Sequence, residues 1–284
     1  MPQPLTTTLI ILGTLAFLFI LYLFAVRPGR ARKSTRYFAT FNYAHRGLHD
    51  DRLPENSLAA FEAACRAGYG IELDVRLSRD GVAMVFHDDT LTRMCGIDRR
   101  VDEFTAAELT RIPLAGNPAH TIPTFRDVLA LVRGRVPILV EIKGTTDAAR
   151  VCEVAAPMLD EYRGAYCIES FSPYAVRWYR RHRPLVVRGQ LSEHYFANRG
   201  KKKTPALWMM QLLLTNFLTK PDFIAFNLRD RHYLPFRLAT RLFGAASFAY
   251  TVKGVRDEEK CCGYFDALIF EGYTPPARSG EYEN

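Results

Sequence analysis

Two stretches decide the fold and hold most of the candidate chemistry: NYAHRGLHD at residues 42–50 and IELDVRLSRDGVAMVFHD at residues 71–88. Alternate residues of a strand share a face, so Glu72 and Asp74 point one way and the apolar residues around them point the other. The turn at 79–81 ends in Asp-Gly, which indicates a hairpin, and its simplest register sets Glu72 opposite His87. Because unpaired buried carboxylates are costly, the pattern favours a functional acidic pair over a solvated edge hairpin.

The rest of the chain alternates between apolar strands and helices, and 284 residues suffice for one large domain. This alternation predicts a mainly parallel sheet, closed as a (β/α)8 TIM barrel. An open doubly wound sheet would usually carry a Gly-rich loop after its first strand, and the sequence has none there. Predicted strands are 42–47, 71–75, 84–88, 137–143, 166–171, 185–191, 223–227, 246–252 and 267–270; predicted helices are 57–67, 105–109, 124–132, 147–162, 173–182, 234–243 and 257–263.

The N-terminal segment predicts a membrane anchor. Residues 5–26 carry no charge, and about 20 apolar residues suffice to cross a bilayer as a helix. Basic residues follow this segment, whereas a cleaved signal peptide would carry its positive charge before it. The positive-inside rule then predicts a single-pass protein with the domain after the anchor in the cytoplasm. The expected domains are an anchor at 1–26, a basic juxtamembrane linker at 27–40, and a barrel at 41–284 with an apolar insertion at 193–221.

Cysteine usage and charge agree with this location. The six cysteines show neither metal-ligand spacing nor a disulfide framework, which suits a reducing compartment. The net charge of +8 owes much to the juxtamembrane cluster, which favours anionic lipid headgroups. No nucleic-acid partner is needed to explain this positive charge. The sequence does not indicate an oligomeric state.

The insertion interrupts the strand-helix rhythm. Thr204-Pro205 is a good helix start, and the residues after it are almost wholly apolar as far as Leu218, so a helix is expected over 205–218. It is too short to span a bilayer. Beside the lysines at 201–203 it reads as an interfacial helix on the membrane surface. The alternatives are a helix packed over the open end of the barrel or one within a dimer interface.

A third carboxylate joins the acidic pair. Glu141 and Lys143 end a predicted strand, and the carboxyl ends of barrel strands form the active-site face. Three close carboxylates raise one another's pKa unless a cation compensates them, and an all-oxygen ligand set favours Mg²⁺ or Ca²⁺. An internal ion pair between Glu141 and Lys143 is the structural alternative. His45 and His87 also end strands on this face, where two imidazoles can divide the roles of general base and general acid.

These residues resemble the glycerophosphodiester phosphodiesterase family, a likeness that covers roughly residues 42–273. The matching segments are His45-Arg46-Gly47, Pro54-Glu55-Asn56-Ser57, Glu72-Leu73-Asp74, His87-Asp88 with Thr90-Leu91 and Arg93, Glu141-Ile142-Lys143 and Ser170-Phe171. The resemblance implies a phospholipase-C-like TIM barrel and hydrolysis of glycerophosphodiesters, or of lysophospholipid-type diesters, to glycerol 3-phosphate, or a lyso-phosphatidate, and an alcohol.

The resemblance also implies roles for single residues. It makes His45 and His87 the acid-base pair. It makes Glu72, Asp74 and Glu141 the ligands of one divalent metal ion. Arg46 and Lys143 would hold the phosphate, with Glu55 in support.

The likeness weakens toward the C-terminus. Where the family commonly has Trp-Thr-Val-Asn, this chain has Tyr250-Thr251-Val252-Lys253, so an aromatic ring able to stack on a glycerol or acyl group is followed by a charge. The last strand ends in Phe270-Glu271-Gly272, where an aspartate-proline ending is usual. These changes bear on the preference for the leaving group. The alternative function is a non-catalytic, membrane-anchored barrel that binds phosphorylated lipid or a partner protein, although binding alone would not need an acid-base pair.

Overall fold

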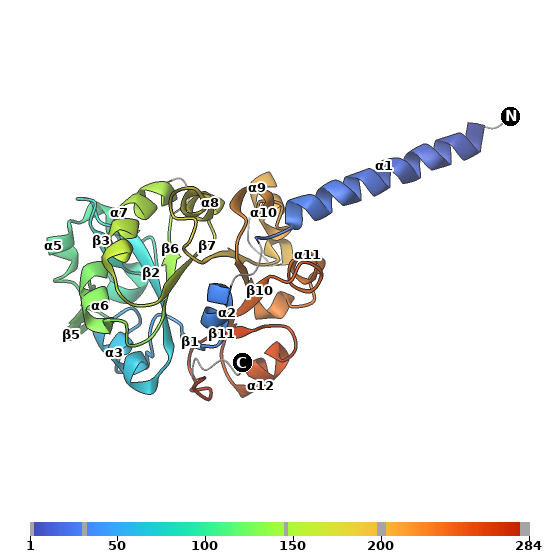
Figure 1. Ribbon diagram of the computed structural model, residues 1–284. Coiled ribbons are helices and arrows are strands. Elements are labelled where there is room, and N and C mark those ends of the chain that lie inside the picture. Colours follow the sequence, from blue (N-terminus) through green and yellow to red (C-terminus); the bar gives the residue numbers. More distant parts are fainter. Residues whose placement is uncertain (1–2, 30–32, 145–146, 198–202, 279–284) are drawn as a thin grey trace.

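The computed structural model describes residues 3–29, 33–144, 147–197 and 203–278 (Figure 1). Within these ranges eight parallel strands close into a barrel, because the first strand pairs with both the second and the last. The closed barrel confirms the predicted fold. Its strands are β1 (Tyr43–Ala44), β2 (Gly70–Leu77), β6 (Ile138–Ile142), β7 (Tyr166–Ser170), β8 (Arg188–Ser192), β9 (Phe223–Asn227), β10 (Ala246–Val252) and β11 (Ala267–Phe270).

Aromatic side chains fill the interior of the barrel. The ring of Phe248 stacks on Phe223 at 4.3 Å and on Tyr43 at 5.7 Å between centroids. Gly189 on β8 makes room for this cluster, since a Cβ there would collide with the ring of Phe223. Stacked aromatic pairs contribute about 0.5–1.5 kcal/mol each beyond their buried area. This packed interior leaves the carboxyl ends of the strands to carry the polar residues.

Helices cover the outside of the barrel. Ser57 begins the first barrel helix by accepting a hydrogen bond from Ala60 N, and Gly68 ends it with φ 76°, a left-handed conformation that glycine adopts readily. Apolar faces of the outer helices pack on strand residues such as Ile71 and Val140. These helices are α3 (Leu58–Ala67), α6 (Phe125–Val132), α7 (Ala148–Glu161), α8 (Pro173–His182), α11 (Leu234–Arg237), the π-helical turn η4 (Leu238–Leu242) and α12 (Val255–Cys261).

A hairpin and several short elements complete the domain. The strand β3 (Ala83–Val85) pairs antiparallel with β2. The other short elements are α4 (Thr92–Cys95), η1 (Val101–Glu103), α5 (Ala106–Leu109), β4 (Pro113–Leu114), β5 (Asn117–Thr121), η2 (Tyr195–Ala197) and η3 (Leu228–Asp230).

The hairpin register differs from the predicted one. Val75 pairs with Val85, a shift of one residue from the register that would set Glu72 level with His87. Ser78 N donates to Val82 O at 3.0 Å, which closes a three-residue loop instead of a two-residue turn. Because loop length fixes the register of a hairpin, that specific pairing was wrong, although the hairpin itself is present.

The predicted linker contains a helix that packs on the barrel. Helix α2 (Lys33–Ala39) lies beside β10 (Figure 1), and its Thr35 and Phe38 are buried. The hydroxyl of Tyr43 donates to Phe38 O at 2.9 Å. The second half of the predicted basic linker is therefore part of the folded domain. The linker residues 30–32, with Arg30 and Arg32, lie outside the described ranges.

Helix α1 (Gln3–Val26) extends away from the barrel (Figure 1). Among the described residues one helix, Leu5–Val26, is long and apolar enough to cross a membrane. Most of its side chains are exposed, unlike those of a core helix. Its length, composition and place at the N-terminus fit a membrane anchor or a signal sequence.

The insertion forms two short helices, so the expected single helix over 205–218 was wrong. Helix α9 (Pro205–Gln211) and helix α10 (Asn216–Thr219) are separated by Leu213, which is fully buried and has φ 55°. Asn216 Nδ2 donates to Val26 O at 2.8 Å, so α10 packs against the end of α1. Packing in three dimensions therefore overrides the helical propensity of this segment. Lys201 and Lys202 lie outside the described residues.

Candidate active site

Side chains from widely separated parts of the chain meet at the carboxyl end of the barrel. His45 and Arg46 follow β1, Glu72 and Asp74 lie in β2, and Glu141 lies in β6. Parallel barrel strands point the same way, so their ends share one face of the molecule. Adjacent strands also bring residues level with one another, as in the pairing of Asp74 with Glu141.

Glu72, Asp74 and Glu141 form one compact, buried acidic cluster. Each offers a carboxylate oxygen, and these three oxygens lie within 4.8 Å of one another. Lys143 Nζ lies 2.8 Å from Asp74 Oδ1 and 2.7 Å from Glu141 Oε1. Close oxygen ligands in a buried setting are a donor set for a hard divalent cation. The ion pair of Glu141 with Lys143, given above as the structural alternative, is thus present within the cluster.

The pKa values of the three carboxyl groups are shifted in different directions. Burial, together with Asp74 and Glu141, raises the pKa of Glu72 well above its usual value. Burial also raises the pKa of Glu141, although Lys143 opposes this. For Asp74 the positive charges of Lys143, His87 and Arg46 outweigh burial and lower the pKa. A carboxylate with a raised pKa gains most from a bound cation.

Two strained loops hold the carboxylates in place. Arg46 N donates to Glu72 Oε2 at 2.9 Å, and Asn56 Nδ2 donates to Asp74 Oδ2 at 2.8 Å. Arg46 and Asn56 have φ values of 57° and 56°, a region that is uncommon for residues other than glycine. Asn56 N also donates to Arg46 O at 2.8 Å, so each loop supports the other. Strain of this kind concentrates at functional sites.

His45 is oriented by the end of the last strand. Its Nδ1 lies 2.5 Å from Glu271 Oε2, and its Nε2 lies 4.0 Å from Glu72 Oε2. Lys253 Nζ in turn lies 2.5 Å from Glu271 Oε1. Burial lowers the pKa of His45, partly opposed by the hydrogen bond with Glu271. The hydrogen bond with His45 holds the pKa of Glu271 below its usual value, so Glu271 remains a carboxylate that accepts from Nδ1.

His87 has a similar set of partners nearby in the sequence. Its Nδ1 lies 2.6 Å from Asp88 Oδ1, and Arg93 Nε donates to Asp88 Oδ2 at 2.6 Å. Burial lowers the pKa of His87, against the opposing effect of Asp74. Arg93 Nη2 also donates to Glu55 Oε1 at 2.6 Å. Glu55 therefore links Arg93 to Arg46, whose Nη1 donates to the same Oε1 at 2.8 Å.

A cavity of about 430 Å³ opens at this face, lined in part by Arg76, His87, Glu141, Lys143 and Phe171. Tyr250 lies near this wall, with its ring edge-on to Phe171 at a centroid distance of 5.8 Å. The hydroxyl of Tyr250 donates to Ser192 O at 2.8 Å. The ring is thereby fixed in place near the mouth of the barrel.

Sequence reasoning missed two acids of this region. Glu271 was treated only as a departure from a familiar strand ending, yet it is the partner of His45. Glu169 lies level with Glu141 on the neighbouring strand, and burial with the charges of Glu72 and Glu141 raises its pKa well above the usual value. The acid inside the apolar run YCIES at 166–170 was the signal for Glu169.

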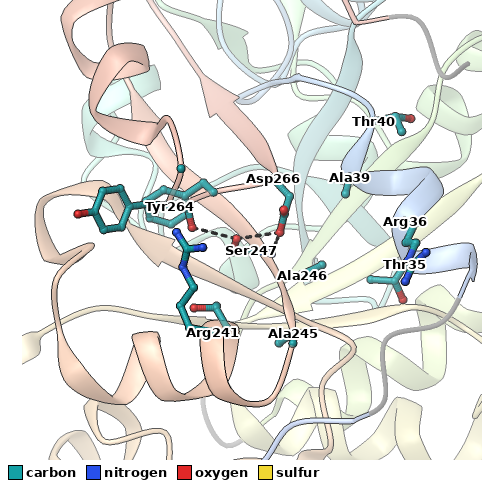
Figure 2. Close-up of a pocket in the computed structure, with 14 residues that line it drawn as sticks. Thr35, Arg36, Ala39, Thr40, Arg241, Ala245, Ala246, Ser247, Tyr264 and Asp266 are labelled. Atoms are coloured by element: carbon teal, nitrogen blue, oxygen red, sulfur yellow. Dashed lines mark hydrogen bonds between the residues drawn. The ribbon is translucent and has the colours of Figure 1, made fainter. Parts of the chain in front are cut away.

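A second cavity, of about 620 Å³, lies at the opposite end of the strands. Figure 2 shows it between α2, which carries Thr35 and Arg36, and the start of β10. Asp266 accepts hydrogen bonds there from Ser247 N and Ser247 Oγ, at 2.8 and 2.9 Å. This carboxylate therefore serves to tie the starts of two strands together.

Comparison with known proteins points to one family. The model of the glycerophosphoryl diester phosphodiesterase family matches residues 45–253. A glycerophosphodiester phosphodiesterase of Bacillus altitudinis is 38% identical over 111 residues, which are 36% of this chain and 43% of that protein. One from Caldanaerobacter subterraneus is 32% identical over 162 residues, 54% of this chain and 66% of that protein. The chain thus spans less than two thirds of the length of both relatives.

Solved structures share the architecture. A phosphodiesterase of Oleispira antarctica, solved in complex with sn-glycerol-3-phosphate, superposes with a TM-score of 0.66 at 20% identity, covering 82% of this chain and 94% of that one. At this level of identity the likeness concerns the fold. It agrees with the closed barrel described above.

Proposed function

Because the chain belongs to the glycerophosphoryl diester phosphodiesterase family, we propose that it hydrolyses glycerophosphodiesters to a glycerol phosphate and an alcohol. One observation carries this proposal: three buried carboxylates converge on one point, with His45 and His87 near them. The contact of His45 with Glu72, and the charge interaction of His87 with Asp74, tie both imidazoles to the cluster. A barrel that only bound a phosphate would need the cations but not two oriented imidazoles.

Glu72, Asp74 and Glu141 would hold one divalent cation, Mg²⁺ or Ca²⁺. When bound, such an ion offsets charge on the non-bridging oxygens of the phosphate. Lys143 already contacts two of these carboxylates and adds a positive charge for the same phosphate. Arg46 supplies a further fixed cation, held in position by Glu55.

The two histidines would divide the proton transfers. One imidazole draws the proton from the glycerol 2-hydroxyl, which attacks phosphorus, and the other protonates the departing alcohol. Water then opens the cyclic phosphate with the roles exchanged. Glu271 and Asp88 each accept from Nδ1, which leaves Nε2 of either ring to exchange the proton. Tyr250 would stack on the glycerol or on the group attached to it.

The test uses the full chain in lipid nanodiscs with glycerophosphodiesters of several headgroups. Hydrolysis should stop with a chelator and return with added Mg²⁺ or Ca²⁺. Glu141→Gln should bind the metal more weakly, whereas Glu153→Gln, an exposed acid on α7, should behave as the unmodified protein. Hydrolysis that is indifferent to chelation would remove the metal from the mechanism. Tight binding of phosphorylated lipid without any turnover would instead support the alternative function, a non-catalytic barrel that binds such lipids.

We also propose that α1 anchors the barrel on the cytoplasmic face of a membrane. The uncharged span is followed by Arg27 and, in the sequence, by further basic residues. By the positive-inside rule, such a basic flank lies on the cytoplasmic side of the membrane. A protease added to intact cells should leave the barrel uncut and should digest it after the membrane is opened. Digestion in intact cells would show that the barrel faces the outside of the cell.

A further inference from the structure

An apolar groove of about 700 Å³ lies between α8 and the insertion. Its walls are formed mainly by apolar side chains. They include Phe171, Tyr174, Leu207, Met209, Met210 and Leu218. Pockets of this size and character accommodate small-molecule groups of drug-like dimensions. No residue in this lining belongs to the acid-base or acidic set described above, so the groove requires an explanation of its own.

The groove and the active-site cavity share a wall. Gly144, Phe171 and Ser172 line both. Lys143, which contacts two of the clustered carboxylates, directly precedes Gly144 and lines the polar side. The groove therefore borders the polar cavity along this wall. A group attached to a phosphate near Lys143 would reach the groove by passing Phe171.

The position of the groove indicates where its occupant comes from. Leu218, in its wall, belongs to α10, and α10 packs against the end of α1 through Asn216 and Val26. Trp208, on the adjacent helix α9, is about half exposed. Figure 1 shows α9, α10 and the C-terminal end of α1 together on one side of the molecule. The apolar groove thus opens near the segment that is suited to a bilayer.

We propose that this groove binds a single hydrocarbon chain carried by the phosphodiester substrate. The substrate class is then a glycerophosphodiester with one long chain, attached either to the glycerol or to the departing alcohol. This inference rests on the proposed function, since it concerns the same reaction. Burial of the chain supplies affinity through the hydrophobic effect, while the polar cavity holds the phosphate.

The first measurement compares chain lengths. The full chain in nanodiscs is assayed with soluble diesters that share one headgroup and carry chains of increasing length, below their micelle concentrations. We expect kcat/KM to rise about two- to fourfold per methylene, as for partial to full burial of each CH₂, and then to level off. One series places the chain on the glycerol and another places it on the alcohol. The series that shows the rise identifies which end of the substrate occupies the groove.

The second measurement changes the groove. Leu207→Asp and Leu207→Trp place a charge or extra volume in it, and each should reduce the preference for chain-bearing over chainless diester at least tenfold. Trp208→Asp is the matched control, since Trp208 lies on the same helix but outside the lining, and it should keep the preference. Circular dichroism checks that each variant is folded, and the bulky variant supplies the test if the charged one unfolds.

Two failures can be told apart. If chainless diester is hydrolysed but kcat/KM is flat with chain length in both series, the groove does not bind a chain, while the phosphodiesterase stands. A preference that survives both Leu207 variants would also overturn the inference. If no diester is hydrolysed with either metal, the proposed function falls and this inference falls with it.

Discussion

The two histidines of the active site are held by the same chemistry, assembled in two different ways. His87 meets Asp88, its neighbour in sequence, and Asp88 meets Arg93, five residues further on. His45 meets Glu271, 226 positions away. In each case Nδ1 faces a carboxylate that is itself paired with a cation. A local segment can build such an arrangement alone, whereas the other exists only because the barrel closes.

The two arrangements also differ in how firmly they are supported. Arg93 contacts Glu55 as well as Asp88, so the His87 side belongs to a network. On the His45 side the second carboxylate oxygen of Glu271 meets Lys253, whose side chain is 64% exposed. Exposed ion pairs contribute little. The His45 side therefore depends mainly on Glu271 itself.

The largest expected effect comes from removing either imidazole. His45→Ala and His87→Ala should each lower kcat by about 10²–10⁴-fold, the range that general acid-base catalysis supplies, because each ring has its own proton to move. Thermal unfolding should show both variants folded. The measurement is steady-state turnover of a glycerophosphodiester with saturating metal. Near-normal turnover in one variant would show that the histidine replaced in it is not catalytic.

Several parts of this site could be predicted from local sequence. The spacing of Glu72 and Asp74 sets both on one face of a strand, and strand-end positions predicted that Glu141 and the two histidines would share a face. The contact of Asp88 with His87 needs only neighbouring residues. Period-two patterning and strand ends are therefore sufficient signals for the candidate site. The roles of its residues stay predictions.

Long-range contacts account for what could not be predicted. Glu271 reaches His45 because β1 pairs with β11, with Tyr43 level with Ile269, and sequence alone does not give that register. The insertion turns at Leu213 because that side chain is buried, and its second helix meets α1. The hairpin register depended on a loop one residue longer than the simplest turn. In each case a tertiary contact or loop length overrode a local pattern.

Smaller losses of activity are expected when the carboxylates that orient the two histidines, Glu271 and Asp88, are replaced. Glu271→Gln should lower kcat by about 10- to 100-fold, the usual cost of losing a group that orients a functional histidine, with KM nearly unchanged. Asp88→Asn should cost less, because Arg76 also holds the backbone of His87, donating to its O at 2.8 and 2.7 Å. Glu271→Asp should recover much of the activity. A raised KM with kcat nearly unchanged would instead indicate a role in substrate binding.

The smallest effect should come from Lys253, the exposed side chain that pairs with Glu271. Lys253→Asn should lower kcat by at most about fivefold at low salt, since an exposed ion pair is worth about 0.2–1 kcal/mol. At about 1 M salt, where the screening length falls to about 3 Å, the difference should largely disappear. Lys260→Asn is the control, because Lys260 pairs with Asp257. A loss from Lys253→Asn as large as that from Glu271→Gln, and insensitive to salt, would show that Lys253 acts on the reaction directly.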